Sequence, residues 1–177
     1  MKKINIADKI STAIAYKGCV TVEYFDKING KKVINAYNEG QTALFNAIVK
    51  MLEGRDINSI SRPSSIGLFN AGGENVLNGS VKYLVTPVLY VAEKDTNGNY
   101  TYSSSNVETS ANCIMYSFTI ALNNYKTGIK DNTVTTLKLL DAEGTELFAT
   151  LDLTKMGQTI KIDTTSNMQI YWRLIFE

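Results

Sequence analysis

The chain is most constrained by residues 167–177, where apolar and polar side chains alternate. Side chains of a β-strand point to opposite faces with a period of two, so every second residue shares one face. The residues expected on the inner face are Met168, Ile170, Trp172, Leu174 and Phe176. We therefore expect this stretch to be a strand that lies inside a sheet and closes the fold of one compact unit.

Further strands are predicted along most of the chain, from runs of β-branched and aromatic residues separated by turn residues. They cover residues 19–25, 32–37, 65–69, 83–91, 100–102, 113–122, 134–140, 147–153 and 159–162. In the strand at 113–122, one face is expected to carry Ile114, Tyr116, Phe118, Ile120 and Leu122. The pattern predicts a mainly β fold, an antiparallel β-sandwich of about eight strands with one helix packed on it.

Turn residues predict how these strands connect. Asn29-Gly30 predicts a hairpin with a type I′ turn, because this turn needs positive φ at both central residues. Asp95-Thr96-Asn97-Gly98-Asn99 and Glu143-Gly144 predict two further hairpins. Pro87 has no N–H donor, so it predicts an edge or a bulge in the strand at 83–91.

One helix is predicted over residues 42–52. Its apolar stripe consists of Leu44, Ile48, Met51 and Leu52. Thr42 suits the start of a helix, and Gly54 stands where a C-terminal glycine is common. The broad apolar face implies that the helix packs on a sheet.

The length of 177 residues favours a single domain. Residues 1–16 fit a helical stripe, through Ile6, Ile10 and Ile14, as well as they fit a strand. We therefore expect an N-terminal arm over residues 1–16 and one β-sandwich domain over residues 17–177.

Charge and composition exclude several classes of partner and chemistry. Lys and Arg number 18 against 17 Asp and Glu, so the net charge of +1 offers no field to attract nucleic acid or an anionic membrane. Histidine, the commonest general base and metal ligand, is absent. No stretch approaches the roughly 20 apolar residues that span a bilayer, and no signal peptide is evident. We expect no cofactor, no metal and no membrane partner, and synthesis in the cytoplasm.

Cys19 and Cys113 lie in apolar, strand-like runs. Two isolated cysteines without histidine are a poor metal site. Buried free thiols in a reducing compartment are favoured over a disulfide.

The carboxylates provide the candidate catalytic groups, because glycoside hydrolysis needs only a pair of them. The candidates are Glu93 with Asp95, Glu108, and Asp141 with Glu143 and Glu146. All lie at strand ends or in turns, where acidic side chains serve solvation and local hydrogen bonding. Residues 95–99 also resemble the first half of a calcium loop, but the later acidic ligand and the flanking helices are missing. No catalytic, cofactor or metal residue is assigned.

The ten tyrosines are the strongest candidates for residues that recognise a ligand or a partner. They have three interpretations: ordinary strand residues, an interface with another subunit, or a stacking platform for sugars. The candidate interface residues are Ile6, Ile10, Ile14, Tyr83, Tyr90, Tyr100 and Tyr102.

Three segments together have the layout of a known class of proteins. Residues 37–54 place a strand and a glycine before a helix, Arg62-Pro63 leads a short strand at 62–69, and a tryptophan-bearing strand ends the segment 161–176. Together they resemble small virion structural proteins of tailed bacteriophages. The resemblance implies a non-enzymatic building block of a head, collar or tail that contacts copies of itself and other virion proteins. It also implies synthesis in the host bacterial cytoplasm and a final location in the virion.

Such a subunit is expected to reach its neighbours with arms and long hairpins. The segments expected to do so are residues 2–16 and the excursion at 94–110, and deletion of the arm is expected to prevent assembly without unfolding the monomer. The alternative is a carbohydrate-binding β-sandwich adhesion module, which predicts exposed tyrosines beside Asn and Asp on one face. The subunit hypothesis instead predicts exposed apolar surface along arms, edges and contacts.

Overall fold

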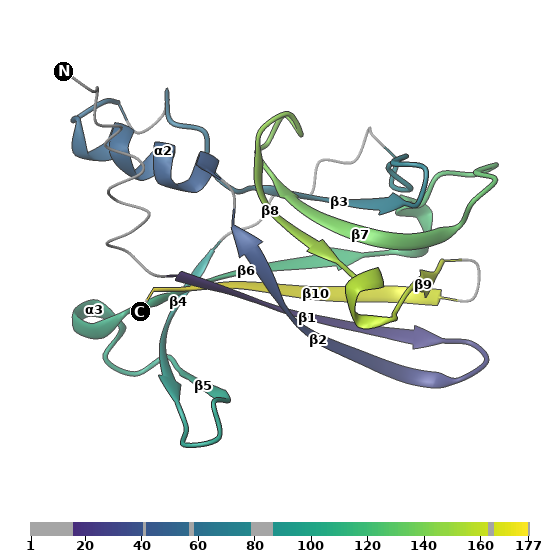
Figure 1. Ribbon diagram of the computed structural model, residues 1–177, viewed down its shortest axis with the longest axis horizontal. Helices are drawn as coiled ribbons and strands as arrows, with labels where there is room; N and C mark the ends of the chain where they lie inside the picture. Colours follow the sequence, from purple (N-terminus) through teal and green to yellow (C-terminus); the bar gives the residue numbers. More distant parts are fainter. Residues whose placement is uncertain (1–15, 41, 57–58, 79–86, 163–164, 177) are drawn as a thin grey trace.

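The fold is mainly β and antiparallel, which confirms the predicted class (Figure 1). The computed structural model describes residues 16–40, 42–56, 59–78, 87–162 and 165–176. Its strands are β1 (Tyr16–Asp26), β2 (Gly30–Gly40), β3 (Ser65–Asn70), β4 (Val88–Lys94), β5 (Tyr100–Ser103), β6 (Cys113–Ile120), β7 (Thr133–Leu140), β8 (Leu147–Asp152), β9 (Ile160–Lys161) and β10 (Thr165–Phe176). Its helical elements are α2 (Thr42–Leu52), the short α3 (Val107–Ser110), and the 3-10 turns η2 (Leu122–Asn124) and η3 (Thr154–Met156).

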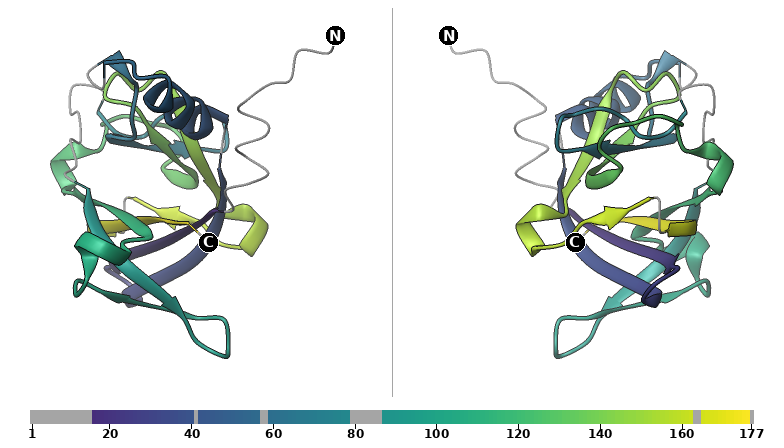
Figure 2. Two further views of the ribbon diagram at one scale, coloured as in Figure 1. Left: turned by 90° about the vertical axis from the view of Figure 1, so that its left-hand side faces the viewer. Right: turned by 90° about the vertical axis from the view of Figure 1, so that its right-hand side faces the viewer.

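The strands form one curled sheet in the order β3-β7-β8-β2-β1-β10-β6-β4-β5, with β9 beside β7. Figures 1 and 2 show that the sheet folds into two layers, with β3, β7 and β8 in one and β2, β1, β10 and β6 in the other. Strand β2 joins the layers: residues 30–38 pair with β1, and Glu39 and Gly40 pair with β8. The two layers of the sandwich are therefore continuous through one strand.

The core lies between the layers. The inner face of β10 carries Met168, Ile170, Trp172 and Leu174, each at most 2 % exposed, as its alternation predicts. The opposite layer contributes Leu68, Leu137, Leu139, Phe148 and Leu151. Strand β10 lies between β1 and β6, so the predicted central position of this strand is confirmed.

The connection between β1 and β2 differs from the predicted type I′ turn. Asp26 pairs with Gly30, which leaves three residues in the loop, and φ is positive at Gly30 but not at Asn29. A three-residue loop closed by a left-handed glycine is a common alternative hairpin geometry. The Asp26 carboxylate stabilises it by accepting hydrogen bonds from the backbone N–H groups of Ile28 and Asn29, both at 2.8 Å.

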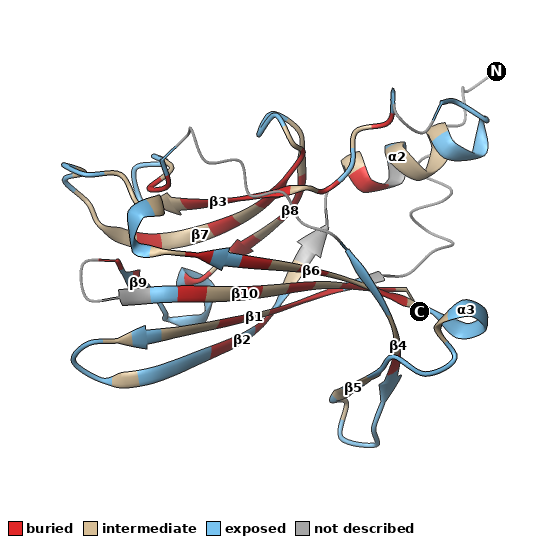
Figure 3. Cartoon of the chain, turned by 180° about the vertical axis from the view of Figure 1, so that it is seen from behind, coloured by how far each residue is buried: buried red, intermediate tan, exposed pale blue. Residues whose placement is uncertain are grey.

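The helix α2 matches its predicted range, but its apolar stripe packs only at one end. Leu44 is buried in the core, whereas Met51 and Leu52 are 54 % and 75 % exposed. Figure 3 shows the same change from buried to exposed along α2. The helix runs past the end of the sheet, so its last turn has no layer beneath it (Figure 1).

Two other predictions are corrected or limited. Leu122 does not share the inner face of β6, because the strand ends at Ile120 and Leu122 lies in η2 with 52 % of its surface exposed. The described part of the strand predicted at 83–91 begins at Val88, directly after Pro87, and runs to Lys94.

Four of the predicted interface residues lie outside the described residues: Ile6, Ile10 and Ile14 of the arm, and Tyr83. Tyr16, the last residue of the predicted arm, belongs to β1.

Candidate functional site

The face of the β2–β1–β10–β6 layer that is turned away from the core is here called the outer face. Because side chains alternate, it carries Cys19 and Thr21 from β1, and Tyr171, Arg173 and Ile175 from β10. The antiparallel register places Cys19 opposite Arg173 and Thr21 opposite Tyr171. Polar and aromatic side chains from distant parts of the chain therefore meet on this face.

The hairpin β4–β5 covers one end of the outer face. Its first residues, Val88 to Tyr90, pair with β6, and its later ones, Val91 to Lys94, pair with β5. A small apolar cluster beneath it contains Cys19, Ala92, Cys113 and Ile175, with Tyr90, Tyr100 and Tyr102 packed against it. Three predicted interface tyrosines are thus brought together, in half-buried positions.

The side chain of Asn112 holds this hairpin in place. Its amide oxygen accepts a hydrogen bond from the Ala92 backbone N–H at 2.7 Å, and its amide nitrogen donates to the Ala92 carbonyl at 3.1 Å. The Asn112 carbonyl also accepts from the Phe176 N–H at 2.8 Å. One residue therefore connects β4 to the end of β10.

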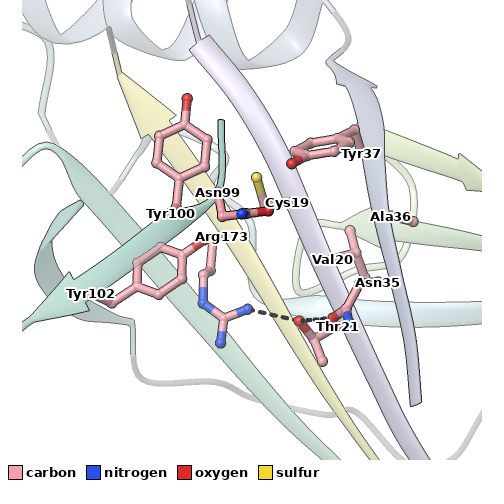
Figure 4. A pocket seen from close by; sticks show the side chains of 10 residues that line it. All are labelled: Cys19, Val20, Thr21, Asn35, Ala36, Tyr37, Asn99, Tyr100, Tyr102 and Arg173. Atoms are coloured by element: carbon pink, nitrogen blue, oxygen red, sulfur yellow. Dashed lines mark hydrogen bonds between the residues drawn. The ribbon is translucent and has the colours of Figure 1, made fainter. Parts of the chain in front are cut away.

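A pocket of about 320 Å³ lies between the hairpin and the outer face (Figure 4). This volume falls at the lower end of the range for small-molecule sites, roughly 300–1,000 Å³. The pocket is lined by Cys19, Val20, Thr21, Asn35, Ala36, Tyr37, Asn99, Tyr100, Tyr102 and Arg173. Among the described residues, its lining combines aromatic rings, amides, a hydroxyl and a guanidinium, and contains no carboxylate.

Arg173 is fixed from two sides. Its Nη1 donates a hydrogen bond to Thr21 Oγ1 at 3.1 Å, and Thr21 Oγ1 donates to Asn35 Oδ1 at 3.0 Å. Its guanidinium carbon lies 4.6 Å from the centre of the Tyr102 ring and 5.6 Å from that of Tyr171. Within the described residues, no carboxylate lies within 4.0 Å of its guanidinium nitrogens. The side chain is therefore an oriented cation without an acidic partner in that part of the chain.

Two groups near Arg173, Tyr102 and Cys113, are neutral at ordinary pH. Burial raises the pKa of Tyr102 to about 12, with Cys19 and Cys113 adding to the rise and Arg173 opposing it. Burial likewise raises the pKa of the Cys113 thiol to about 11, against the lowering effect of Arg173. Cys19 and Cys113 are both buried thiols, as predicted. The local charge in the pocket therefore comes from Arg173.

A second exposed region lies along the hairpin β1–β2. Phe25, Val33 and Tyr37 are 53 %, 49 % and 62 % exposed on the outer face, and Ile28 at the turn is 77 % exposed. In the described part of the chain, residues 30–38 of β2 pair with β1 on one side and have no strand on the other. A hollow of about 300 Å³ adjoins this edge and is lined by Tyr37, Asn38, Thr150, Leu151, Asp152, Lys155 and Met156.

Two of the candidate carboxylates serve their own turns. Asp95 accepts hydrogen bonds from the backbone N–H groups of Asn97 and Asn99, both at 2.8 Å, in the predicted β4–β5 hairpin turn. Asp141 accepts from the N–H groups of Thr145 and Glu146 at 2.8 and 3.2 Å.

The contacts of these two aspartates match the predicted role of the acidic residues in turns, whereas Glu108 lies in a short helix and not at a strand end or in a turn. Glu93 lies on β4 and Glu108 on α3, both exposed. Glu143 and Glu146 lie in the turn between β7 and β8. Among the described residues, no group of three acidic or cysteine side chains is placed to hold a metal ion.

The sequence reasoning did not identify Arg173, Thr21, Asn35 or Asn112. The sequence pattern could have indicated Arg173, because it is a charged residue at an outward position of a strand whose inner face is strongly apolar. No sequence pattern indicated Asn112, because its role depends on where β4 turns away from β6.

In the described part of the chain, no helix is long and apolar enough to cross a membrane. Comparison with protein-family models, with curated proteins and with solved structures yields no match.

Proposed function

We propose that this chain is a non-enzymatic structural subunit of a tailed-bacteriophage virion, which acts by associating with copies of itself and with neighbouring virion proteins. The observation that carries the proposal is the concentration of exposed apolar side chains on the hairpin β1–β2, at an edge of the sheet. Large apolar groups on a surface favour contact with another protein when they gather in one region.

The backbone of β2 supports the same proposal. An edge strand presents N–H and C=O groups that another strand can pair with, and a second copy of the same strand is self-complementary about a two-fold axis. Lys31 and Lys32 lie near the turn, where charge discourages pairing. We therefore place the contact with a second copy over residues 33–38.

The outer-face side chains would enlarge this contact. Val33 and Tyr37 project from the same face of β2, and Phe25 lies on the adjacent strand. Lys31 and Glu23 form an ion pair at 3.2 Å between them, so the surface has a polar component as well. Apolar groups with polar groups around them are typical of protein interfaces.

The layout of residues 37–54, 62–69 and 161–176 supports the assignment to virion proteins, as a resemblance. The alternative, a carbohydrate-binding adhesion module, is favoured by a different observation, the pocket beside Arg173 and Tyr102. Tyr102 is itself a poor stacking platform, because the Arg173 guanidinium already lies over its ring.

The proposal is tested by measuring the mass of the purified protein by light scattering over a range of concentration, with negative-stain images of the same samples. Discrete oligomers, rings or a lattice are expected. The variant Val33→Lys is expected to shift association to concentrations at least about tenfold higher, because it places a charge in the contact.

The matched control is Leu52→Lys, which changes a still more exposed apolar residue at the end of α2, 75 % exposed against 49 % for Val33. It is expected to associate like the parent protein. A strict monomer at high concentration, or the same loss of association in both variants, would contradict self-association through β2.

A further inference from the structure

Arg173 has unused capacity to bind an anion. A guanidinium carries five N–H donors in a rigid fork that suits carboxylates. Within the described residues, one donor is used, toward Thr21 at 3.1 Å. The contacts with Tyr102 and Thr21 orient the group before any ligand arrives, which reduces the entropy lost on binding.

The surroundings of the pocket carry more positive than negative charge. Lys17 Nζ lies 5.7 Å from the centre of the Tyr37 ring, and Lys94 Nζ lies 5.9 Å from that of Tyr100. Both rings line the pocket. The nearby acid is Asp95, which accepts a hydrogen bond from the Asn99 side chain at 3.3 Å. Within the described residues, these three cations against the Asp95 carboxylate favour an anionic ligand.

The remaining lining suits a molecule rich in hydroxyl groups. Asn35, Asn99 and Thr21 offer amide and hydroxyl partners, and Tyr37 and Tyr100 lie on opposite sides of the pocket (Figure 4). Aromatic rings pack against the apolar faces of sugar rings while their hydroxyls reach water. A plain inorganic anion would leave these groups without a role.

We propose that this pocket binds a carboxylated sugar, with the carboxylate on Arg173, the hydroxyls on Asn35 and Asn99, and the ring between Tyr37 and Tyr100. The site is separate from the self-association contact, except that Asn35, Ala36 and Tyr37 lie within residues 33–38 and also line the pocket. A subunit of this kind would carry its own binding site for acidic polysaccharide.

The test is a titration followed by two-dimensional NMR or calorimetry with three probes: D-glucuronate, D-glucose and acetate. Glucose lacks the carboxylate and acetate lacks the ring. Saturable binding of glucuronate in the millimolar range or tighter is expected, with affinity at least about tenfold above either other probe. Equal binding of glucose, equal binding of acetate, or no binding of glucuronate would overturn the proposal.

Variants locate the site. Arg173→Gln is expected to weaken glucuronate binding about tenfold or more, and Asn35→Ala about threefold, with less risk to the fold because Asn35 is exposed. The control is Lys138→Gln, which removes a cation 4.3 Å from the centre of the Phe69 ring, in the other layer. Loss of binding in the control equal to that in Arg173→Gln, or unchanged binding in Asn35→Ala and Arg173→Gln together, would overturn the assignment.

The titration is repeated with Val33→Lys, which separates this proposal from self-association. Binding that persists in this variant is expected, because Val33 does not line the pocket. Binding that disappears there would show that the ligand needs the assembled protein, which contradicts a site complete within one chain.

Discussion

The guanidinium of Arg173 lies 4.6 Å from the centre of the Tyr102 ring, so a cation–π contact joins β10 to β5. The same guanidinium donates to Thr21 on β1. Contacts of this kind contribute about 0.5–2 kcal/mol each, depending on desolvation. Together with the hydrogen bonds between Asn112 and Ala92, this side chain holds the β4–β5 hairpin over the outer face beside the pocket.

Replacing Tyr102 should show how much this contact contributes. Tyr102→Ala is expected to lower the free energy of unfolding by roughly 1–3 kcal/mol, because it removes the ring from Arg173 and from the Cys113 cluster. Tyr102→Phe keeps the ring and is expected to cost about 1 kcal/mol or less. Urea unfolding of both variants measures the difference, and equal losses would argue against a contribution from the ring.

Trp172 should be the most sensitive core position on β10. Its side chain is 0 % exposed, and within the described residues its Nε1–H has no hydrogen-bond partner. Trp172→Ala is expected to cost about 3–5 kcal/mol through loss of burial and a cavity. Trp172→Phe is expected to cost clearly less, because it also removes a buried donor that is not satisfied. Chemical denaturation distinguishes them; a phenylalanine variant as unstable as the alanine variant would contradict this explanation.

Acid should destabilise the protein partly through Asp141, which is 8 % exposed. Burial raises the pKa of its carboxyl, but hydrogen bonds from Thr145, Glu146 and Ser61 outweigh this and hold the pKa below its ordinary value. A carboxyl with a depressed folded pKa contributes stability that is complete above its unfolded pKa, near about 3.9, and is lost as pH falls through the folded value.

The variant Asp141→Asn tests this directly. It is expected to lose roughly 1–3 kcal/mol near neutral pH and to show a shallower further loss down to about pH 3. Urea midpoints across this range give the measurement. Glu108→Gln, an exposed change on α3, serves as the control and should follow the parent curve. A parallel acid limb in Asp141→Asn would mean that other groups control acid stability.

Cys113 should resist alkylation in the folded protein. It is 1 % exposed, and burial raises the pKa of its thiol to about 11, so little thiolate forms near pH 8. In a Cys19→Ser background, iodoacetamide labelling of Cys113 is expected to be slower than in urea by a factor of about a hundred or more. Mass spectrometry over time follows the reaction; native labelling as fast as in urea would contradict the buried, protonated thiol.

The elements that could be predicted from the sequence are those specified by the spacing of apolar residues within one short segment. The alternation around Trp172 identified β10 and its buried face, and the stripe beginning at Leu44 identified α2. Both follow from the spacing of apolar residues, which does not depend on the partner. The helix end at Met51 and Leu52 was not predicted to be exposed, because the pattern does not say where the supporting sheet stops.

The candidate site depended on information that is not local. Tyr100 and Tyr102 were singled out as aromatic residues, but their partner Arg173 is far away in the chain and meets them only because β4 turns away from β6 after Tyr90. The same turn gives Asn112 its backbone partners. The turn at Gly30 differs from the predicted type I′ turn for a related reason. Its loop has three residues, and the Asp26 carboxylate accepts hydrogen bonds from two of their backbone N–H groups. The Asn-Gly pair alone does not reveal this contribution of Asp26.

The central place of β10 has a consequence during synthesis on the ribosome. Thr21 and Arg173 are 152 positions apart, so β1 and β6 have no strand between them until β10 has been translated. Until then both strands expose hydrogen-bonding edges, and pairing over such a sequence distance is slow. Nascent chains stalled before Thr165 are therefore expected to be protease-sensitive and to recruit chaperones, and the sheet should become resistant only after β10 leaves the exit tunnel.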